Sequence, residues 1–154
     1  MKLLAKTLLC ASVCALTLSS TANANDSFKH EIDARQSYMQ VLRHNIGQLG
    51  AMAKGKKPYD AELAKAAAQN LALAASMNNA FMWPKGSDNA NAKNTDALPA
   101  IWDQLAKVKK INGDMKEASE NLAKHAGNGL SEVRKYIGAV GKTCKGCHDD
   151  FKAE

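Results

Sequence analysis

Two cysteines followed directly by a histidine stand near the end of the chain, in the run Cys144-Lys145-Gly146-Cys147-His148. On a helix, residues three and four positions apart share one face, so the two thiols lie side by side and His148 lies one turn from Cys144. This C-x-x-C-H spacing is typical of c-type haem attachment, in which two thiols add to vinyl groups and the imidazole binds iron. We therefore predict one covalent haem c, attached through Cys144 and Cys147, with His148 as the iron ligand.

Two other uses of a C-x-x-C pair fit the sequence less well. A thioredoxin-like redox site needs a βαβ setting, and no stretch here has the pattern of a strand. A structural zinc site needs further ligands at matching spacing. Cys10 and Cys14 do not supply them, because they lie in a segment that we expect to be removed.

The N-terminal segment has the pattern of a secretory signal peptide. Lys2 and Lys6 precede an apolar run over residues 7–18, and Ala22-Asn23-Ala24 supplies a cleavage site. The apolar run is too short to span a bilayer. We predict a signal peptide over residues 1–24, one mature domain over residues 25–154 without a membrane span, and a periplasmic location, since covalent haem attachment in bacteria takes place outside the cytoplasmic membrane.

The charge is basic overall, with 21 Lys and Arg against 15 Asp and Glu and a formal net charge of +6. The basic residues are scattered and acids are interleaved with them, which indicates solvated helix faces. An exported protein without a basic stripe is a poor candidate for a nucleic-acid partner. A mildly acidic redox partner is compatible with this charge, but nothing in the sequence identifies it.

Apolar periodicity and a high alanine content predict four helices. We place them over residues 27–54, 60–83, 99–125 and 131–152, with a break near Asn112-Gly113, an N-cap at Ser131 and one long polar loop over residues 85–96. Four amphipathic helices with a metal centre on facing helices predict an all-α, antiparallel four-helix bundle around the haem. The Ala-rich second helix fits against another helix of the subunit or against a second subunit.

The first helix carries a charged residue in its apolar seam. Phe28, Ile32, Arg35, Met39, Leu42, Ile46 and Leu49 follow one another in steps of four and three. Arg35 either reaches to a helix end or holds an anion inside the bundle, such as a haem propionate, with Gln36 beside it. Met39, one turn on, is either a core filler or the residue that faces the far side of the iron.

The fourth helix has the same seam, formed by Val133, Ile137, Val140, Cys144, Cys147 and Phe151. The cysteines thus belong to the buried stripe, and the haem must fill part of the bundle core. His30, His44 and His125 fall off the seams or at helix ends, as surface histidines do. In the polar loop, Thr95 is either a propionate partner or a plain turn residue.

Several of these stretches together resemble class II cytochromes c, the family of cytochrome c′. The resemblance lies in the C-terminal run 144–152, in Arg35-Gln36 with Met39, in Trp83-Pro84-Lys85-Gly86-Ser87, in Thr95 and in Pro99-Ala100-Ile101-Trp102. It implies thioethers at Cys144 and Cys147, proximal ligation by His148, a propionate held by Arg35, Gln36 and Thr95, and Met39 as the distal residue. It also implies a basic Lys152 near the histidine and a periplasmic homodimer with five-coordinate iron that binds NO and CO.

Three functions compete on this basis. The first is a five-coordinate haem protein that binds diatomic gases, transfers electrons to an unidentified redox partner, or does both. The second is a low-spin electron carrier in which Met39 closes the sixth position, since His/Met ligation raises the potential. The third is an enzyme such as a peroxidase, which we do not expect, because the resemblance implies Met39 as the residue facing the iron and no distal acid or histidine is placed to assist O–O cleavage.

Overall fold

The structure is a computed structural model that describes residues 28–154; the predicted signal peptide lies outside the described residues. No helix within that range is both long enough and apolar enough to cross a membrane. The long helices are α1 (Lys29–Ala53), α2 (Ala61–Ala75), α4 (Leu105–His125) and α5 (Leu130–Phe151). The short ones are η2 (Ala80–Met82), α3 (Ala100–Asp103) and η3 (Ala126–Asn128).

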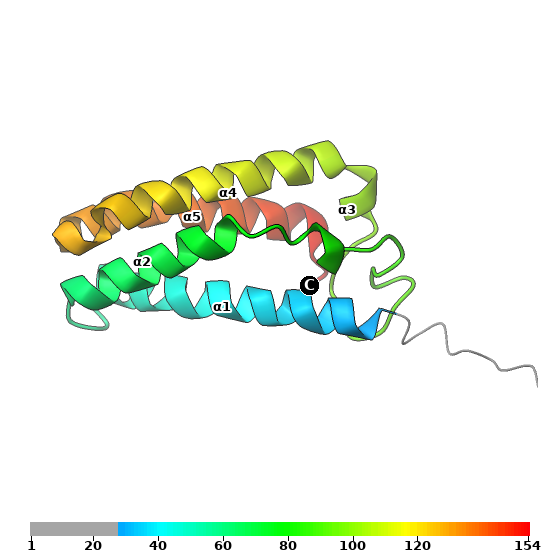
Figure 1. Ribbon diagram of the computed structural model, residues 1–154, viewed down its shortest axis with the longest axis horizontal. Coiled ribbons are helices and arrows are strands. Elements are labelled where there is room, and N and C mark those ends of the chain that lie inside the picture. Colours follow the sequence, from blue (N-terminus) through cyan, green and yellow to red (C-terminus); the bar gives the residue numbers. More distant parts are fainter. Residues whose placement is uncertain (1–27) are drawn as a thin grey trace, which may run out of the picture.

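The four long helices form the predicted antiparallel bundle. Figure 1 shows them side by side, with successive long helices running in opposite directions. Around the bundle, α1 contacts α2, α2 contacts α4, α4 contacts α5, and α5 returns to α1 with the sparsest contact of the four pairs. Among residues 28–154 the only β pairing is an isolated bridge between Ala97 and Lys152.

Both predicted seams point into the bundle. On α1, Ile32, Arg35, Leu42 and Leu49 are buried, and Met39 and Ile46 are half-buried. On α5, Val133, Val140 and Phe151 are buried, and the two cysteines are half-buried. His30 and His44 are exposed, as expected, whereas His125 is half-buried and stacks on Tyr136 with a centroid distance of 4.5 Å.

One end of the bundle, which we call the closed end, holds the short connections α1–α2 and α4–α5. Leu49, Met52, Ala64, Leu122 and Val133 have no exposed surface there. The Tyr59 hydroxyl donates to the Ala126 carbonyl at 2.9 Å and accepts from the Gly129 amide at 2.9 Å. A single phenol therefore ties the first connection to the second.

The second helix ends earlier than predicted. Asp60 caps it as expected, accepting from the Leu63 amide at 2.9 Å, but α2 stops at Ala75 instead of near Trp83. Asn78 lies just beyond, and its side chain accepts from the Ala80 amide, which is a local bond that competes with the helical one. Residues 76–83 therefore leave the helix and cross the end of the bundle through η2.

The third predicted helix breaks at another place. It divides at Gln104, with φ −122° and ψ 40°, into α3 and α4, while Asn112 and Gly113 lie within α4. The indole of Trp102 donates to the Trp83 carbonyl at 3.0 Å and so fixes α3 against the loop. The fourth helix begins at Leu130 after Gly129, whose φ of 129° suits glycine, so Ser131 is not its N-cap.

The opposite end, which we call the open end, is covered by the loop between η2 and α3. The Leu98 amide donates to the Phe151 carbonyl, and the Ala153 amide donates to the Asp96 carbonyl at 2.8 Å. Lys152 also pairs with Asp96 at 3.2 Å. The loop is thus fastened to the C-terminal turn of the helix that carries the cysteines.

Candidate haem site

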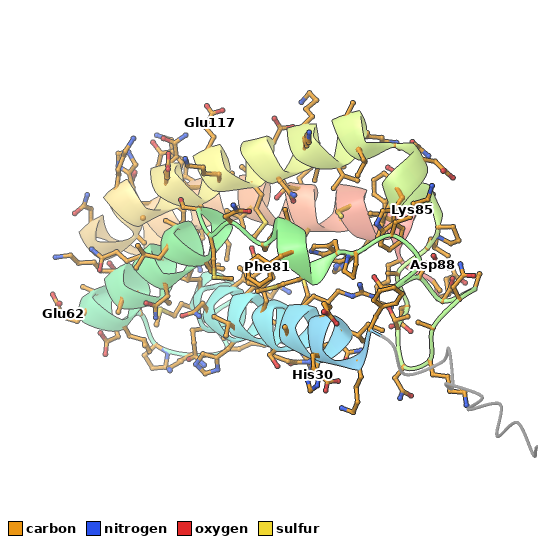
Figure 2. The ribbon with its side chains drawn as sticks, turned by 45° about the vertical axis from the view of Figure 1, so that its right-hand side comes forward. His30, Glu62, Phe81, Lys85, Asp88 and Glu117 are labelled. Carbon is orange, nitrogen blue, oxygen red and sulfur yellow. The ribbon has the colours of Figure 1, made fainter. Side chains whose placement is uncertain are left out.

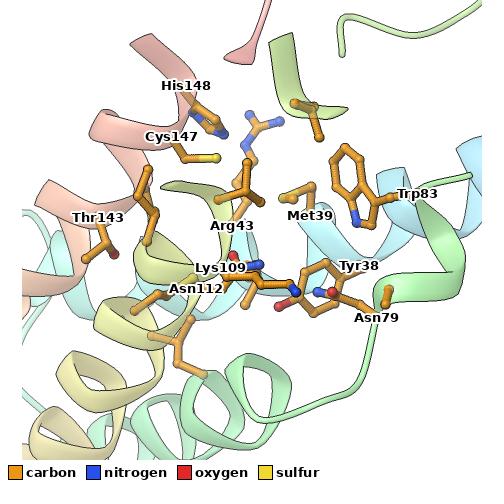
Figure 3. Close-up of a pocket in the computed structure, with 18 of the residues that line it drawn as sticks. Tyr38, Met39, Arg43, Asn79, Trp83, Lys109, Asn112, Thr143, Cys147 and His148 are labelled. Carbon is orange, nitrogen blue, oxygen red and sulfur yellow. The ribbon is translucent and has the colours of Figure 1, made fainter. Parts of the chain in front are cut away.

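A cavity of about 490 Å³ lies in the open half of the bundle. Its wall comes from α1, the α2 end, η2, α3, α4 and α5, and much of it is apolar, including Leu42, Leu71, Ile101, Val108 and Met115. Figure 3 shows the surrounding side chains converging from these elements. Cofactor pockets are typically hollows of this size, with a few polar groups in a mostly apolar wall.

The C-x-x-C-H residues form one wall of this cavity. Cys144, Cys147 and His148 all line it from α5, and Figure 3 shows Cys147 and His148 next to each other. The two thiols are half-buried and not joined in a disulfide, and His148 is exposed. One helix therefore presents two thiols and an imidazole to one hollow.

Met39 lies on another wall of the same cavity. It projects from α1, is half-buried, and packs against the main hydrophobic core. Trp83 lies close to it in Figure 3. A second methionine, Met115, lines the cavity from α4, so the cavity lining offers two thioethers on different helices.

Arg35 is buried, with 3% of its surface exposed, and does not reach a helix end. Its guanidinium donates to the Ser87 hydroxyl at 2.6 Å, to the Ser87 carbonyl, and to the Thr95 hydroxyl at 2.6 Å. It also stacks on Trp83, with 4.7 Å from Cζ to the ring centroid. Because Trp83 lines the cavity, the cation lies directly behind the cavity wall.

Gln36 and Thr95 meet the same loop. The exposed Gln36 amide donates to the Asn94 carbonyl at 2.6 Å. Thr95 accepts from Arg35 and from the Ala97 amide at 3.1 Å. The structure thus brings Arg35, Gln36 and Thr95 together across the sequence, but none of the three lines the cavity as Met39 and the cysteines do.

Two members of this cluster had no predicted role in the site. Ser87 has no exposed surface and Asp88 has 3%; Asp88 accepts from the Ala90 amide and from the Asn91 side chain. A serine and an aspartate in a Gly-Ser-Asp-Asn run look like ordinary turn residues. The only sequence signal for them was Arg35, because a charged residue in an apolar seam needs buried hydrogen-bond acceptors from another part of the chain.

Burial shifts the ionisation of the site. Burial lowers the pKa of Arg35, while the nearby Asp88 charge raises it. Burial raises the pKa of the Cys144 thiol, and burial followed by the Cys144 charge raises that of Cys147. The thiols of the haem-free chain are therefore favoured in the neutral form.

The residues present fit a covalent haem. The cavity has the volume and apolar wall of a cofactor site, both thiols open onto it with an imidazole beside them, and a buried guanidinium lies behind its wall. A hydrophobic macrocycle with anionic carboxylates has the chemistry that this arrangement matches.

The comparisons with known proteins agree on one group. A family model described as Cytochrome C' matches residues 30–152. Cytochrome c-554 of Cereibacter sphaeroides is 38% identical over 144 residues, covering 90% of this chain and 94% of that protein. Cytochrome c′ of the same organism is 36% identical over 137 residues, covering 89% and 91%. The solved cytochrome c′ from Rhodobacter sphaeroides superimposes with a TM-score of 0.80 at 35% identity, covering 82% of this chain and 98% of the other.

Proposed function

The chain belongs to the cytochrome c′ family, whose members carry covalent haem c, and we propose that it is a periplasmic haem protein with five-coordinate, histidine-ligated iron. In this proposal it binds the diatomic gases NO and CO, transfers electrons, or does both. The observation that carries the proposal is the apolar cavity lined by Cys144, Cys147, His148 and Met39. The family consists in general of haem carriers and gas-binding proteins, and we assign no enzymatic reaction to this chain.

The two cysteines and the histidine of the C-x-x-C-H run each have one role in this proposal. Cys144 and Cys147 form the thioethers, and His148 binds the iron. When bound, the haem supplies an iron atom that changes oxidation state and coordinates small ligands. The helix supplies rigidity, because both attachment points and the ligand lie on consecutive turns of α5.

Arg35, Gln36 and Thr95 are the residues that we assign to a haem propionate. Arg35 is a fixed cation in a buried setting, and its terminal nitrogens already point at hydroxyl and carbonyl oxygens of the loop. A carboxylate is a stronger acceptor than either. The guanidinium is thus held ready beside the cavity, and the loop hydroxyls complete the polar end of the site.

Whether Met39 binds the iron determines whether a small ligand can bind there. A thioether that remains unbound leaves an apolar surface, which favours small uncharged diatomics over anions and excludes water. A thioether on the iron would instead give a low-spin electron carrier, which is the alternative function. The half-buried position of Met39 in the cavity wall makes it the residue on which to test the difference.

The visible spectrum of the holoprotein, oxidised and reduced, with and without CO, tests the proposal. We expect a high-spin reduced spectrum that changes completely with CO, and a Met39→Ala variant with the same resting spectrum. Met115→Ala is the matched control, because Met115 lines the same cavity from α4. Sharp low-spin bands that ignore CO and vanish only in Met39→Ala would establish the electron-carrier alternative.

We also assign a homodimer interface to an outer surface formed by α1, α2 and the segment 76–82 that follows α2. Val41, Leu73, Met77 and Phe81 are large apolar residues with 50%, 72%, 45% and 70% of their surface exposed, and Phe81 stands on the surface in Figure 2. Val41 lies between Tyr38 and Asn45, both of which bond to α2, so it borders that helix. One solved cytochrome c′ is described by a ligand-controlled dimer dissociation, which supports such a pair here.

Sedimentation velocity tests the interface. A Leu73→Asp, Phe81→Asp variant should sediment as a monomer, while Leu105→Asp, at a half-exposed leucine of α4 that borders the cavity, should remain a dimer. A monomeric wild type, or a dimer that survives the double substitution, would contradict this assignment.

A further inference from the structure

Charge is segregated between the faces of the bundle. No Asp or Glu occurs from residue 34 to residue 59, which covers most of α1 and the turn after it, or from residue 133 to residue 148, which covers most of α5. By contrast, α4 mixes lysines with Asp114, Glu117 and Glu120, and Lys110 and Lys116 pair with two of these acids. The interleaving of charges along the sequence therefore does not hold for every face.

The acid-free stretches of α1 and α5 are neighbours in space. The Arg134 Nε donates to the Ala53 carbonyl at 2.9 Å, and the nearest atom to a side chain added at Gly50 would be Cδ1 of Ile137 at 4.0 Å. Because α1 and α5 run in opposite directions, these pairs place Arg43 near the level of Cys144. Both of those residues line the cavity.

Five exposed cations therefore share one surface, which we call the basic face: Arg43, Lys54, Arg134, Lys142 and Lys145. Among residues 28–154, Lys145 is the only one of these five cations that pairs with an acid, Asp149. From Arg43 to Lys54 the face extends along α1 by about 16 Å, at 1.5 Å per residue. That length exceeds a single small anion and suits the surface of another protein.

Two exposed glycines lie between the cations of the basic face, Gly47 on α1 and Gly138 on α5. A side chain at either position would meet nothing within 4 Å. Arg43 lines the same cavity as Cys147 and His148, and all three are labelled in Figure 3. A partner lying on this face would therefore come close to the cofactor wall without displacing large side chains.

We propose that the basic face docks an acidic one-electron carrier protein, a partner whose surface carries carboxylates around its redox centre. This inference rests on the proposed haem function of the cavity. Opposite charges raise the association rate and fix the orientation of such partners. One electron passes from the partner's reduced centre to the oxidised protein, or returns by the same route; no bond forms and no atom is transferred.

Stopped-flow reduction of the oxidised holoprotein by reduced flavodoxin, an acidic one-electron carrier used as probe, tests the proposal. We expect the second-order rate constant of the wild type to fall at least about ten-fold between low salt and 0.5 M NaCl, because screening removes the attraction. Lys54→Glu with Lys142→Glu, neither of which lines the cavity, should lower the low-salt rate by about ten-fold and flatten the salt dependence.

A matched control carries the same charge change on another face. Lys65→Glu with Lys124→Glu, both exposed and on α2 and α4, should keep the salt dependence of the wild type. An equal loss in this control, or a wild-type rate that ignores salt, would overturn the proposal. So would competition by inorganic phosphate beyond that of NaCl at equal ionic strength, because the face would then be a small-anion site.

The haem function is read separately in the same samples. Both double-substitution variants should keep the wild-type visible spectrum and its response to CO. A spectrum showing low-spin iron would overturn the five-coordinate proposal while leaving the salt dependence to decide docking. An Arg43→Gln variant, which removes the cation at the cavity edge without reversing its charge, should lower the flavodoxin rate by less than the double substitution does.

Discussion

The core of this bundle is packed differently at its two ends. At the closed end, Leu49, Met52, Leu122 and Val133 exclude solvent completely, and Tyr59 ties the two connections together. At the open end the same four helices surround a cavity of about 490 Å³, and Met39 and the two cysteines that line it are only half-buried. The closed end is complete with protein atoms alone, whereas the open end has the shape of a site that a cofactor completes.

The difference shows how a helical bundle makes space without losing its fold. The seams of α1 and α5 continue through both ends with the same spacing, but the side chains at the open end include Met39, Cys144 and Cys147 in place of close-packed aliphatic residues. The closed end sets the helix directions, and the loop with its Arg35 cluster holds the helices at the other end. If the two ends are independent, a substitution at one end should leave the other unchanged.

Removing both thiols should have the largest effect. A Cys144→Ser, Cys147→Ser chain should retain no haem after denaturing electrophoresis and should lose about 4 kcal/mol or more of stability, since a tightly held ligand stabilises the fold that binds it. Hydrogen exchange should accelerate at the open end and spare the closed end. The control is Lys145→Ser, which changes the same motif but leaves both thiols; equal exchange at the two ends of the double variant would refute their independence.

A cavity made at the closed end should lower the free energy of unfolding by less than the loss of both thiols does. Its effect should be confined to the closed end. Leu122→Ala removes a side chain with no exposed surface and should lower the free energy of unfolding by about 3 kcal/mol. Urea titration measures the loss, and the visible spectrum should not change. Leu105→Ala, at a half-exposed leucine, should cost under about 1 kcal/mol; a spectral change in Leu122→Ala would show that the ends are coupled.

The Arg35 cluster should make an intermediate contribution. Arg35→Leu leaves the buried Ser87 hydroxyl and its carbonyl without their donor, which should cost about 2 kcal/mol. If the guanidinium also holds a propionate, the reduction potential should shift as well. A lower melting temperature with an unchanged potential would restrict Arg35 to fastening the loop, and Gln36→Ala, at an exposed neighbour, serves as the control.

Tyr38 should give the smallest effect, and that effect depends on pH. Its hydroxyl donates to the Ala74 carbonyl at 3.2 Å, and burial raises the pKa of Tyr38 above its usual value of about 10. The neutral phenol therefore stabilises the fold below pH of about 10, and this contribution disappears as pH rises through the raised value. Tyr38→Phe should cost about 1 kcal/mol at pH 8 and lose less on going to pH 11 than the wild type, as urea midpoints at both pH values would show.

The sequence predicted the features that depend on local spacing. The C-x-x-C-H run, the two seams and the fold follow from intervals of three and four residues, and the structure has all of them. The predicted end of α2 was wrong because it also relied on spacing. Leu73, Met77 and Phe81 continue a helical interval, but the chain leaves the helix at Ala75 and all three are exposed. Periodicity does not report whether a face is covered.

Features that join distant segments were not predictable from spacing. The acceptors of Arg35 lie about fifty and sixty residues away along the chain, at Ser87 and Thr95, in a loop whose composition does not distinguish a buried serine from an exposed one. The basic face has the same origin, because α1 and α5 are far apart in sequence and adjacent in space. The two stretches without acids are visible in the sequence, but only the placed helices show that they form one surface.

The Tyr59 bridge also bears on the order in which the molecule assembles. The α1–α2 and α4–α5 connections are short, and both lie at the end where this hydroxyl joins them. Contacts between neighbouring segments form fastest, since little chain entropy is lost in closing them. We therefore expect the chain to condense from the Tyr59 end, with the thiol-bearing turns of α5 the last to be enclosed. An early intermediate of this kind would hold its two cysteines within reach of an incoming porphyrin while the rest of the bundle is already in register.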